Sequence, residues 1–440
     1  MTASFLISAA TAASLFLFES TALAGSEAAF VQFDNLGYEG KYYPVGKVEA
    51  LSDGNCSCEQ AMDSPISING TNSPFNEELS VHIRGPINLQ KFAFYTAESY
   101  TYGSSDGSWT RGAYYDVTNG TADNVTFLGN VGEENTCLAR ALNYVTSNGT
   151  SLASESTVLE NVTIDSAKEF AIYSATKCKD ESSLEGDCLV YRDGIDAYHG
   201  FYGTVKAFLF QFSAPSDLSE ENKKNKTGDY DMPAIWLLNA QIPRTSQYPL
   251  NGNCSAWNTG AGEFDILEVM NDTERNHFYT TIHDYQGTGL LEVGLQMTAY
   301  IERTPDAVMK GGVVFGSDGT ATVFLSNSTT FGDTINSSDL SSWLASLEDV
   351  SGGEHTQTLS SITLGAVAET TSTTGSGSGS GSETSDSGTS TSDVSGDGSS
   401  SIATSSSSSN AAFKSSTMFI DSSIGLFASI LSLIASAFVL

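Results

Sequence analysis

The sequence predicts an all-β fold, a β-sandwich or jelly roll, for the globular part of the chain, residues 25–368. Short runs rich in β-branched and aromatic residues recur there, and Gly-rich segments separate them, as in strands joined by turns. No long segment with an apolar period of 3.6 residues interrupts these runs. The clearest expected strands are Ala207–Phe212, Pro233–Leu238, Glu263–Met270 and Phe278–His283, with a hairpin over Val313–Leu325 that turns at Gly316–Gly319.

The globular part is expected to divide near residue 105. Residues 25–105 form a small β-rich N-terminal module, which holds two cysteines and a strand-like run at Leu79–Arg84. The turn-rich segment Tyr100–Ser108 is typical of a linker. Residues 106–368 form the larger jelly-roll domain.

Both ends of the chain have the composition of targeting signals. Residues 1–24 are mostly apolar and small and end in Ala-Leu-Ala, which predicts a secretory signal peptide cut after Ala24, although no Lys or Arg precedes the apolar run. Residues 411–440 end in an apolar, uncharged stretch that follows a small triplet and a spacer. This pattern predicts the propeptide of a glycosylphosphatidylinositol (GPI) anchor attached at Asn410. A retained membrane helix is the alternative, and the 17 residues of 424–440 are few for one.

A low-complexity segment, residues 369–410, joins the globular part to this tail. Of its 42 residues, 33 are Ser, Thr or Gly, so it has no apolar period from which a core could form. We expect a flexible, O-glycosylated stalk that holds the globular part away from the anchor. The protein is therefore expected outside the cell, on the outer face of the plasma membrane.

The N-glycosylation sequons (Asn-x-Ser/Thr) and the even number of cysteines are typical of a secreted protein. With a signal peptide, six cysteines predict three disulfides whose pairing the sequence leaves open, although Cys178 and Cys188 could close a local loop. Zinc is the alternative for Cys56 and Cys58, but no second pair of matching spacing and no His cluster accompany them. The candidate N-glycosylation sites are Asn55, Asn69, Asn119, Asn124, Asn148, Asn161, Asn225, Asn253, Asn271, Asn327 and Asn336.

The charge balance excludes one class of function. With 52 acidic and 19 basic residues the formal net charge is −33, and a nucleic-acid binder needs a basic surface. Attraction to anionic lipid is disfavoured for the same reason.

The candidate site is a group of three acids in one expected strand, Gly262–Glu268. On a strand, Glu263 and Asp265 share one face, whereas Phe264 and Ile266 point into a core. Glu268 follows five residues after Glu263, so a regular strand would place it on the wrong face. A β-bulge near Ile266–Leu267 would restore the phase and align all three carboxylates.

Such a row is costly because like charges raise each other's pKa. Retaining glycoside hydrolysis uses this arrangement: one carboxylate attacks the anomeric carbon, and a second, protonated one donates to the leaving oxygen. A carboxyl group between them can hold a proton or a hydrogen bond that separates their pKa values. The alternatives are a satisfied acidic patch or a calcium site, although calcium prefers oxygens clustered in a loop.

The same residues carry a resemblance to a known family. Glu-x-Asp-x-x-Glu after Gly262 resembles the bulged active-site strand of glycoside hydrolase family 16, and Met232–Leu238 and Thr280–His283 resemble the strands on either side of it. The wider chain, over most of residues 30–365, is similar to the fungal Target-of-SBF glycosyl-hydrolase-like cell-wall proteins, which have MPAIWLLNAQIPRT and GEFDILEV segments. Their N-terminal part resembles the segments around Cys56 and Phe75–Pro86.

The resemblance implies a concanavalin-like jelly roll that acts on β-1,3-glucan, without a cofactor or metal. Glu263 would be the nucleophile, Asp265 the helper and Glu268 the acid/base. The glucan cleft would contain Trp236, His283 and, less directly, Trp257. We expect a monomeric, retaining endo-β-1,3-glucanase of the cell wall. A glucan transglycosylase with the same residues and a non-catalytic glucan-binding wall protein are the alternatives.

Overall fold

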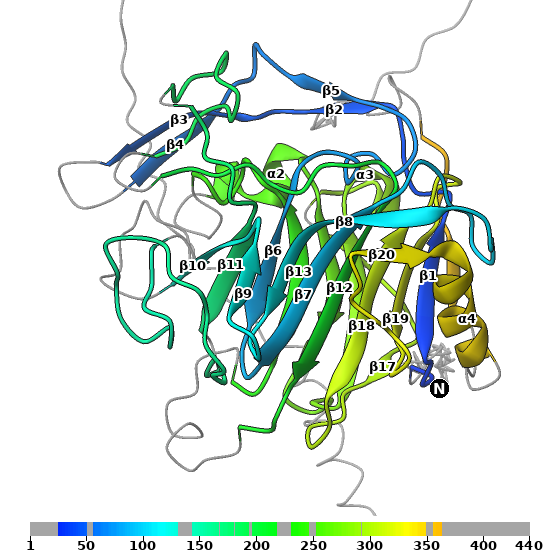
Figure 1. Ribbon diagram of the computed structural model, residues 1–440. Coiled ribbons are helices and arrows are strands. Elements are labelled where there is room, and N and C mark those ends of the chain that lie inside the picture. The colour runs from blue at the N-terminus through cyan, green and yellow to red at the C-terminus, as the bar shows by residue number, and fades with distance from the viewer. Residues whose placement is uncertain are drawn as a thin grey trace, which may run out of the picture. The chain divides into compact units, whose positions relative to one another are not determined.

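The computed structural model describes residues 25–50, 56–130, 143–166, 168–179, 181–192, 196–217, 230–245, 252–291, 293–348 and 355–362. These residues form two β-sheets packed into a sandwich (Figure 1), so the predicted all-β jelly roll is confirmed. The expected signal peptide, stalk and anchor signal, with Asn410, lie outside the described residues, as do Asn55 and Asn225.

The larger sheet has nine strands in the order β20-β8-β7-β12-β18-β19-β1-β21, with β9 beside β8. Its neighbours run antiparallel except for β1 and β21, which are parallel. Its strands are β1 (Phe30–Asp34), β7 (Asn88–Thr96), β8 (Ser108–Asp116), β9 (Thr121–Asp123), β12 (Lys206–Ser213), β18 (Met309–Phe315), β19 (Ala321–Leu325), β20 (Thr334–Asn336) and β21 (Thr356–Thr358).

The smaller sheet has eight strands in the order β10-β11-β6-β13-β14-β15-β16, with β17 beside β15. Its strands are β6 (Leu79–Arg84), β10 (Thr126–Gly129), β11 (Glu169–Tyr173), β13 (Ala234–Asn239), β14 (Glu263–Glu268), β15 (His277–His283), β16 (Leu295–Gln296) and β17 (Ile301–Glu302). Two short ribbons, seen at the top of Figure 1, pair β2 (Gly40–Tyr42) with β5 (Ile66–Ile68) and β3 (Val45–Ala50) with β4 (Cys56–Gln60).

The core lies between the two sheets and is rich in aromatic side chains. Alternate residues of each strand point inward, so Phe208, Phe210 and Phe212 of β12 meet Phe264 and Ile266 of β14 in one buried cluster. Each fully buried side chain of this size contributes about 1.5–3 kcal/mol to folding. This packing fixes which face of β14 is turned away from the core.

The expected strands and hairpin are confirmed. Leu79–Arg84 is β6, and the four runs named above coincide with β12, β13, β14 and β15 within a few residues. The hairpin is formed by β18 and β19, and its turn includes Gly319 at φ 79°, a left-handed conformation that favours glycine.

One helix departs from the expectation. No long helix was expected, because no long segment with a helical apolar period was found in the sequence. The structure nevertheless has a helix of twelve residues, α4 (Ser337–Glu348). Its Leu340, Trp343 and Leu344 recur at helical spacing and join Tyr95 and Trp109 in a second cluster on the larger sheet. The other helical segments are single turns: η1 (Gly252–Cys254), α2 (Ala256–Thr259) and α3 (Tyr285–Thr288). Within the described ranges no helix is long and apolar enough to cross a membrane.

The segments on either side of residue 105 share both sheets. β6 lies between β11 and β13, and β7 lies between β8 and β12. The expected linker falls between β7 and β8, which are themselves paired. The described residues up to 362 belong to one compact unit.

Candidate active site

The three acids of β14 lie on one face of the smaller sheet. Glu263 is opposite Leu238 of β13, Asp265 is opposite Trp236, and Glu268 is opposite Ala234. Because these partners are alternate residues of one regular strand, all three acids share their face. The register of β14 shifts between Asp265 and Glu268 against both neighbours, so the predicted β-bulge is confirmed.

This face is turned away from the core of the sandwich and is covered by the short ribbons. Trp236 and Leu238 belong to a third apolar cluster with Tyr42 of β2 and Cys58 of β4. Glu263 is 8% exposed and Asp265 is 4% exposed. The Glu268 side chain is 20% exposed. The acidic row, defined as Glu263, Asp265 and Glu268, is thus poorly hydrated.

Poor hydration and mutual repulsion raise the pKa values at both ends of the row. Burial, together with the charges of Asp265 and Glu268, holds the pKa of Glu263 well above its ordinary range. Burial raises the pKa of Glu268 to about 7, and the charge of Asp265 acts in the same direction. The row therefore retains protons at a pH where exposed carboxyl groups are fully ionised.

Arg84 opposes this effect at one end of the row. Its Nη2 lies 3.0 Å from Glu268 Oε1, and its Nε donates to the Met232 carbonyl at 2.8 Å. The guanidinium is thereby held against the carboxyl and lowers the pKa of Glu268 relative to what burial alone would give. Sequence reasoning missed Arg84 as a site residue.

Two aromatic residues expected near the cleft lie at the middle of the row. His283 Nε2 is 3.3 Å from Asp265 Oδ2. The Trp257 ring stacks on the His283 ring, with centroids 4.2 Å apart and planes 9° apart. Trp257 also lowers the pKa of Glu263, against the larger effect of burial.

Trp236 lies opposite Asp265 but is only 4% exposed. Its ring stacks on His82 of β6, with centroids 5.3 Å apart. Burial lowers the pKa of His82 to about 3, so this ring is neutral, and it shares a hydrogen bond with Ser80. The structure thus brings all six predicted catalytic and substrate-binding residues to one face.

The alternation of polar and apolar residues in β6 is the sequence pattern that could have indicated His82 and Arg84 as site residues. Ser80, His82 and Arg84 alternate with Val81 and Ile83, which are buried in the core. That alternation was present in the sequence, but the sequence did not indicate that β6 pairs with β13.

A disulfide connects a ribbon to the segment that carries Trp257. Cys58 of β4 is bonded to Cys254, and α2 begins two residues later with Ser255 as its N-cap. The Cys178–Cys188 disulfide closes a local loop, as expected. Cys58 is therefore not a zinc ligand. Cys137 lies outside the described residues.

Two groups among the described residues have the spacing of a cation site. In one, Cys178 and Cys188 accompany His199, but their sulfurs are bonded to each other. The other joins Glu263, Asp265 and His283, with candidate atoms within 4.8 Å of one another. These three already interact as members of the row, and we assign no metal to them.

Comparison with known proteins agrees with this sandwich and its N-terminal strands. A family model for the C-terminal part of the cell wall protein YJL171C/Tos1 matches residues 107–343, and one for its N-terminal part matches residues 29–97. The chain belongs to a family of cell wall proteins. That family is YJL171C/Tos1, the one expected from the sequence.

Relatives cover most of the chain. The probable circularly permuted 1,3-beta-glucanase PGA52 of Candida albicans is 48% identical over 351 residues, which is 79% of this chain and 89% of that protein. The probable circularly permuted 1,3-beta-glucanase YJL171C of Saccharomyces cerevisiae is 44% identical over 340 residues, 76% of this chain and 85% of that protein. No solved structure matches the chain.

Proposed function

We propose that the protein is a cell-wall 1,3-β-glucanase that cleaves its substrate by double displacement at the acidic row. The observation that carries the proposal is the bulge of β14, which aligns three carboxylates on one face of the sheet. The names of the relatives support β-1,3-glucan as the substrate. The resemblance to glycoside hydrolase family 16 supports the assignment of roles.

In the first half of the reaction, Glu268 acts as the general acid. Its pKa of about 7 keeps it protonated at mildly acidic pH, so it donates a proton to the glycosidic oxygen as the bond breaks. A neutral Glu268 no longer repels charge on Glu263, and Glu263 ionises more easily. Glu263 then attacks the anomeric carbon and forms a glycosyl-enzyme.

In the second half, Glu268 removes a proton from the attacking water, and the bond to Glu263 breaks. Asp265 shares a hydrogen bond with Glu263, and His283 Nε2 lies 3.3 Å from Asp265 Oδ2. The Asp265 carboxyl is thereby fixed between the two reacting groups. In this proposal the stacked rings of Trp257 and His283 contact the sugar beside Asp265.

A glucan transglycosylase is the second candidate, because Glu263 and Asp265 are so little exposed. It uses the same three carboxylates, but a sugar hydroxyl replaces water as the acceptor. Incubation with laminarin and a labelled laminari-oligosaccharide separates the two. Longer labelled chains indicate transfer, whereas new reducing ends without them indicate hydrolysis.

The catalytic proposal is tested with the secreted, purified chain and laminarin. We expect new reducing ends from the wild type and from Asp116→Asn, which alters a buried carboxyl group in the larger sheet. We expect a loss of at least about 10³-fold in Glu263→Gln. Equal release by wild type and Glu263→Gln would refute the catalytic role, and glucan binding without release would favour a structural wall protein.

The location of the enzyme is part of the proposal. A signal peptide cut after Ala24 and a GPI anchor at Asn410 would place it outside the cell, at the membrane or in the wall, with the glycosylated stalk as a spacer. Release from intact cells by a phosphatidylinositol-specific phospholipase tests the anchor.

A further inference from the structure

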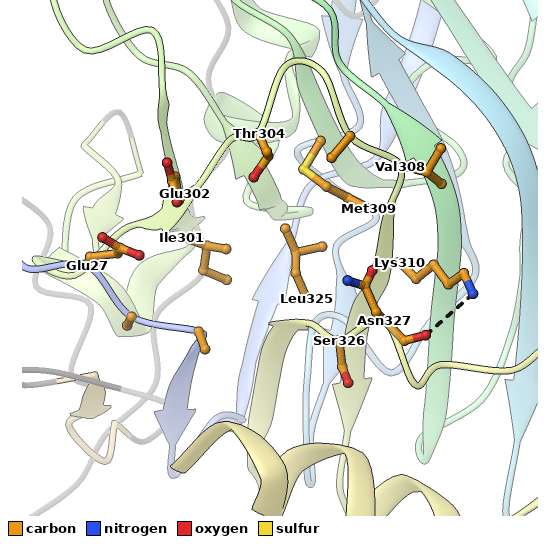
Figure 2. A pocket seen from close by; sticks show the side chains of 13 residues that line it. Glu27, Ile301, Glu302, Thr304, Val308, Met309, Lys310, Leu325, Ser326 and Asn327 are labelled. Atoms are coloured by element: carbon orange, nitrogen blue, oxygen red, sulfur yellow. Dashed lines mark hydrogen bonds between the residues drawn. The ribbon is translucent and has the colours of Figure 1, made fainter. Parts of the chain in front are cut away.

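A cavity of about 250 Å³ lies away from the acidic row, where the residues before β1 meet β17 and the open end of the β18–β19 hairpin. Ile301, Met309 and Leu325 give it apolar walls, and Figure 2 shows Glu27 and Glu302 on one side of them. Pockets for drug-sized ligands have roughly 300–1,000 Å³. This cavity is therefore suited to a smaller group.

Asn327 is itself part of the wall. Figure 2 shows its side-chain amide turned toward Leu325 and Lys310, on the cavity side of the turn that follows β19. It is the first residue of the sequon Asn327-Ser328-Thr329. The atom to which an N-glycan is attached therefore faces the cavity.

The turn that presents Asn327 is fixed by hydrogen bonds. Thr329 donates to the Ser326 carbonyl through its backbone N–H at 3.0 Å and through its hydroxyl at 2.8 Å. Lys310 Nζ donates to the Asn327 carbonyl at 3.4 Å. A sugar on Asn327 would start from a defined position and lose little further freedom on packing.

We propose that the cavity is the seat of the chain's own N-glycan, with the first N-acetylglucosamine on Asn327 packed into it. The apolar walls suit the C–H face of the sugar ring. Glu27 and Glu302 offer acceptors for its hydroxyl groups, and Lys310 offers a donor. The glycan would cover Val308, which is 42% exposed without it.

The attachment chemistry is that of the secretory pathway and rests on the predicted secretion. The Asn327 Nδ2 bonds to C1 of the sugar and gives up one amide proton. The C1–O bond to a lipid-linked pyrophosphate donor breaks, and the pyrophosphate leaves with the electron pair. No oxidant or reductant takes part.

The experiment compares two sequons in the full-length protein secreted from a host that adds N-glycans. Asn148 is the control, because it lies on an exposed turn and lines neither described cavity. Folded protein is treated with an amidase that cuts between Asn and the first sugar. Release at each site is followed by mass spectrometry of peptides, and denatured protein is treated in parallel.

We expect release at Asn327 to be about tenfold slower than at Asn148 in the folded protein and equally fast after denaturation, because the amidase needs the seat to open. We also expect Asn327→Gln to lower Tm by a few degrees, whereas Asn69→Gln, at an exposed sequon that lines neither described cavity, leaves it unchanged. An unoccupied Asn327, equal release at both sites in the folded protein, or an unchanged Tm in Asn327→Gln would each overturn the proposal. None of these results depends on glucanase activity.

Discussion

At the residue scale, the row is a compromise between stability and chemistry. Glu263 is buried beside the charges of Asp265 and Glu268, and Glu268 is partly buried beside the charge of Asp265, so the pKa values of both groups are raised. A carboxyl group whose pKa is raised by folding stabilises the folded state least at high pH. This loss of folding stability occurs at the site where the proposed reaction needs a proton donor and a nucleophile close together.

The first prediction is a loss of activity at alkaline pH. Glu268 must be protonated to act as the acid, and its pKa in the folded protein is about 7. We expect kcat/KM on laminarin to fall as pH rises through about 7, tenfold per pH unit above it. A pH profile that is flat from 6 to 9 would contradict the role of Glu268.

The second prediction concerns Arg84, which we regard as a positioning residue. The charge of Arg84 lowers the pKa of Glu268. In Arg84→Ala the alkaline limb of the pH profile, where kcat/KM falls, should therefore shift to higher pH by about one unit, and kcat should fall several-fold. Arg84→Lys should reverse most of this alkaline shift but restore less of kcat, since a lysine has one donor nitrogen and does not reproduce the contacts of two guanidinium nitrogens with Glu268 and the Met232 carbonyl.

The control for Arg84 is Arg111→Ala, which removes an ion pair with Asp333 in the larger sheet. Arg111→Ala should leave the alkaline limb of the kcat/KM profile unchanged. An unchanged alkaline limb in Arg84→Ala would show that the guanidinium only supports the fold.

At the element scale, the β14 strand explains why the sequence was informative. The acids are spaced by two residues and then by three, and only a bulge reconciles this spacing with a buried Phe264 and Ile266. The pairing of β6 with β13 depends on contacts between segments far apart in the chain, which no local pattern encodes. The position of Arg84 beside Glu268 is therefore known only from the structure.

The sequence did not predict two other features, a disulfide and a helix, for different reasons. The Cys58–Cys254 pairing is one of many that six cysteines allow, and nothing local selects it. The helix α4 was overlooked although Leu340, Trp343 and Leu344 have helical spacing, because twelve residues surrounded by strands make a weak periodic signal.

The third prediction concerns the ribbon that covers the row. The Cys58–Cys254 disulfide spans 196 residues, so its loss should reduce the free energy of unfolding by about 2–5 kcal/mol. It also precedes Trp257, so Cys58→Ala with Cys254→Ala should raise KM for laminarin more than it changes kcat.

The matched control is the Cys178–Cys188 disulfide, which spans 10 residues. Its removal should cost less stability and leave KM unaffected, because a shorter closed loop restricts the unfolded chain less. Equal effects of both double variants on KM would argue that the ribbon has no part in substrate binding.

At the scale of the whole molecule, the two parts matched by the family models build one sandwich. The segment matched at residues 29–97 contains β1, β6 and β7, and β6 and β7 are interior strands of the two sheets. Both sheets contain strands from either side of residue 105, where the sequence predicts a division. The composition of the chain carried no information about this order of strands.

The fourth prediction follows from this sharing of strands. Residues 106–368 expressed alone lack β1, β6 and β7, so six strands lose a hydrogen-bonded neighbour and the core loses the apolar side chains of the missing strands. We expect this fragment to be insoluble or to lack a cooperative thermal transition, whereas residues 25–368 unfold cooperatively. A soluble fragment with a sharp transition and laminarin activity would contradict the shared sandwich.

The stereochemistry of the first product tests the central claim most directly. Proton NMR of early laminari-oligosaccharide turnover resolves the anomer that is formed before mutarotation. Double displacement at Glu263 and Glu268 predicts that hydrolysis releases the β-anomer first, and that transfer to a sugar acceptor forms a new β-glycosidic bond. If the α-anomer appears first, the two carboxylates do not act as nucleophile and acid/base, and the account of the row is wrong.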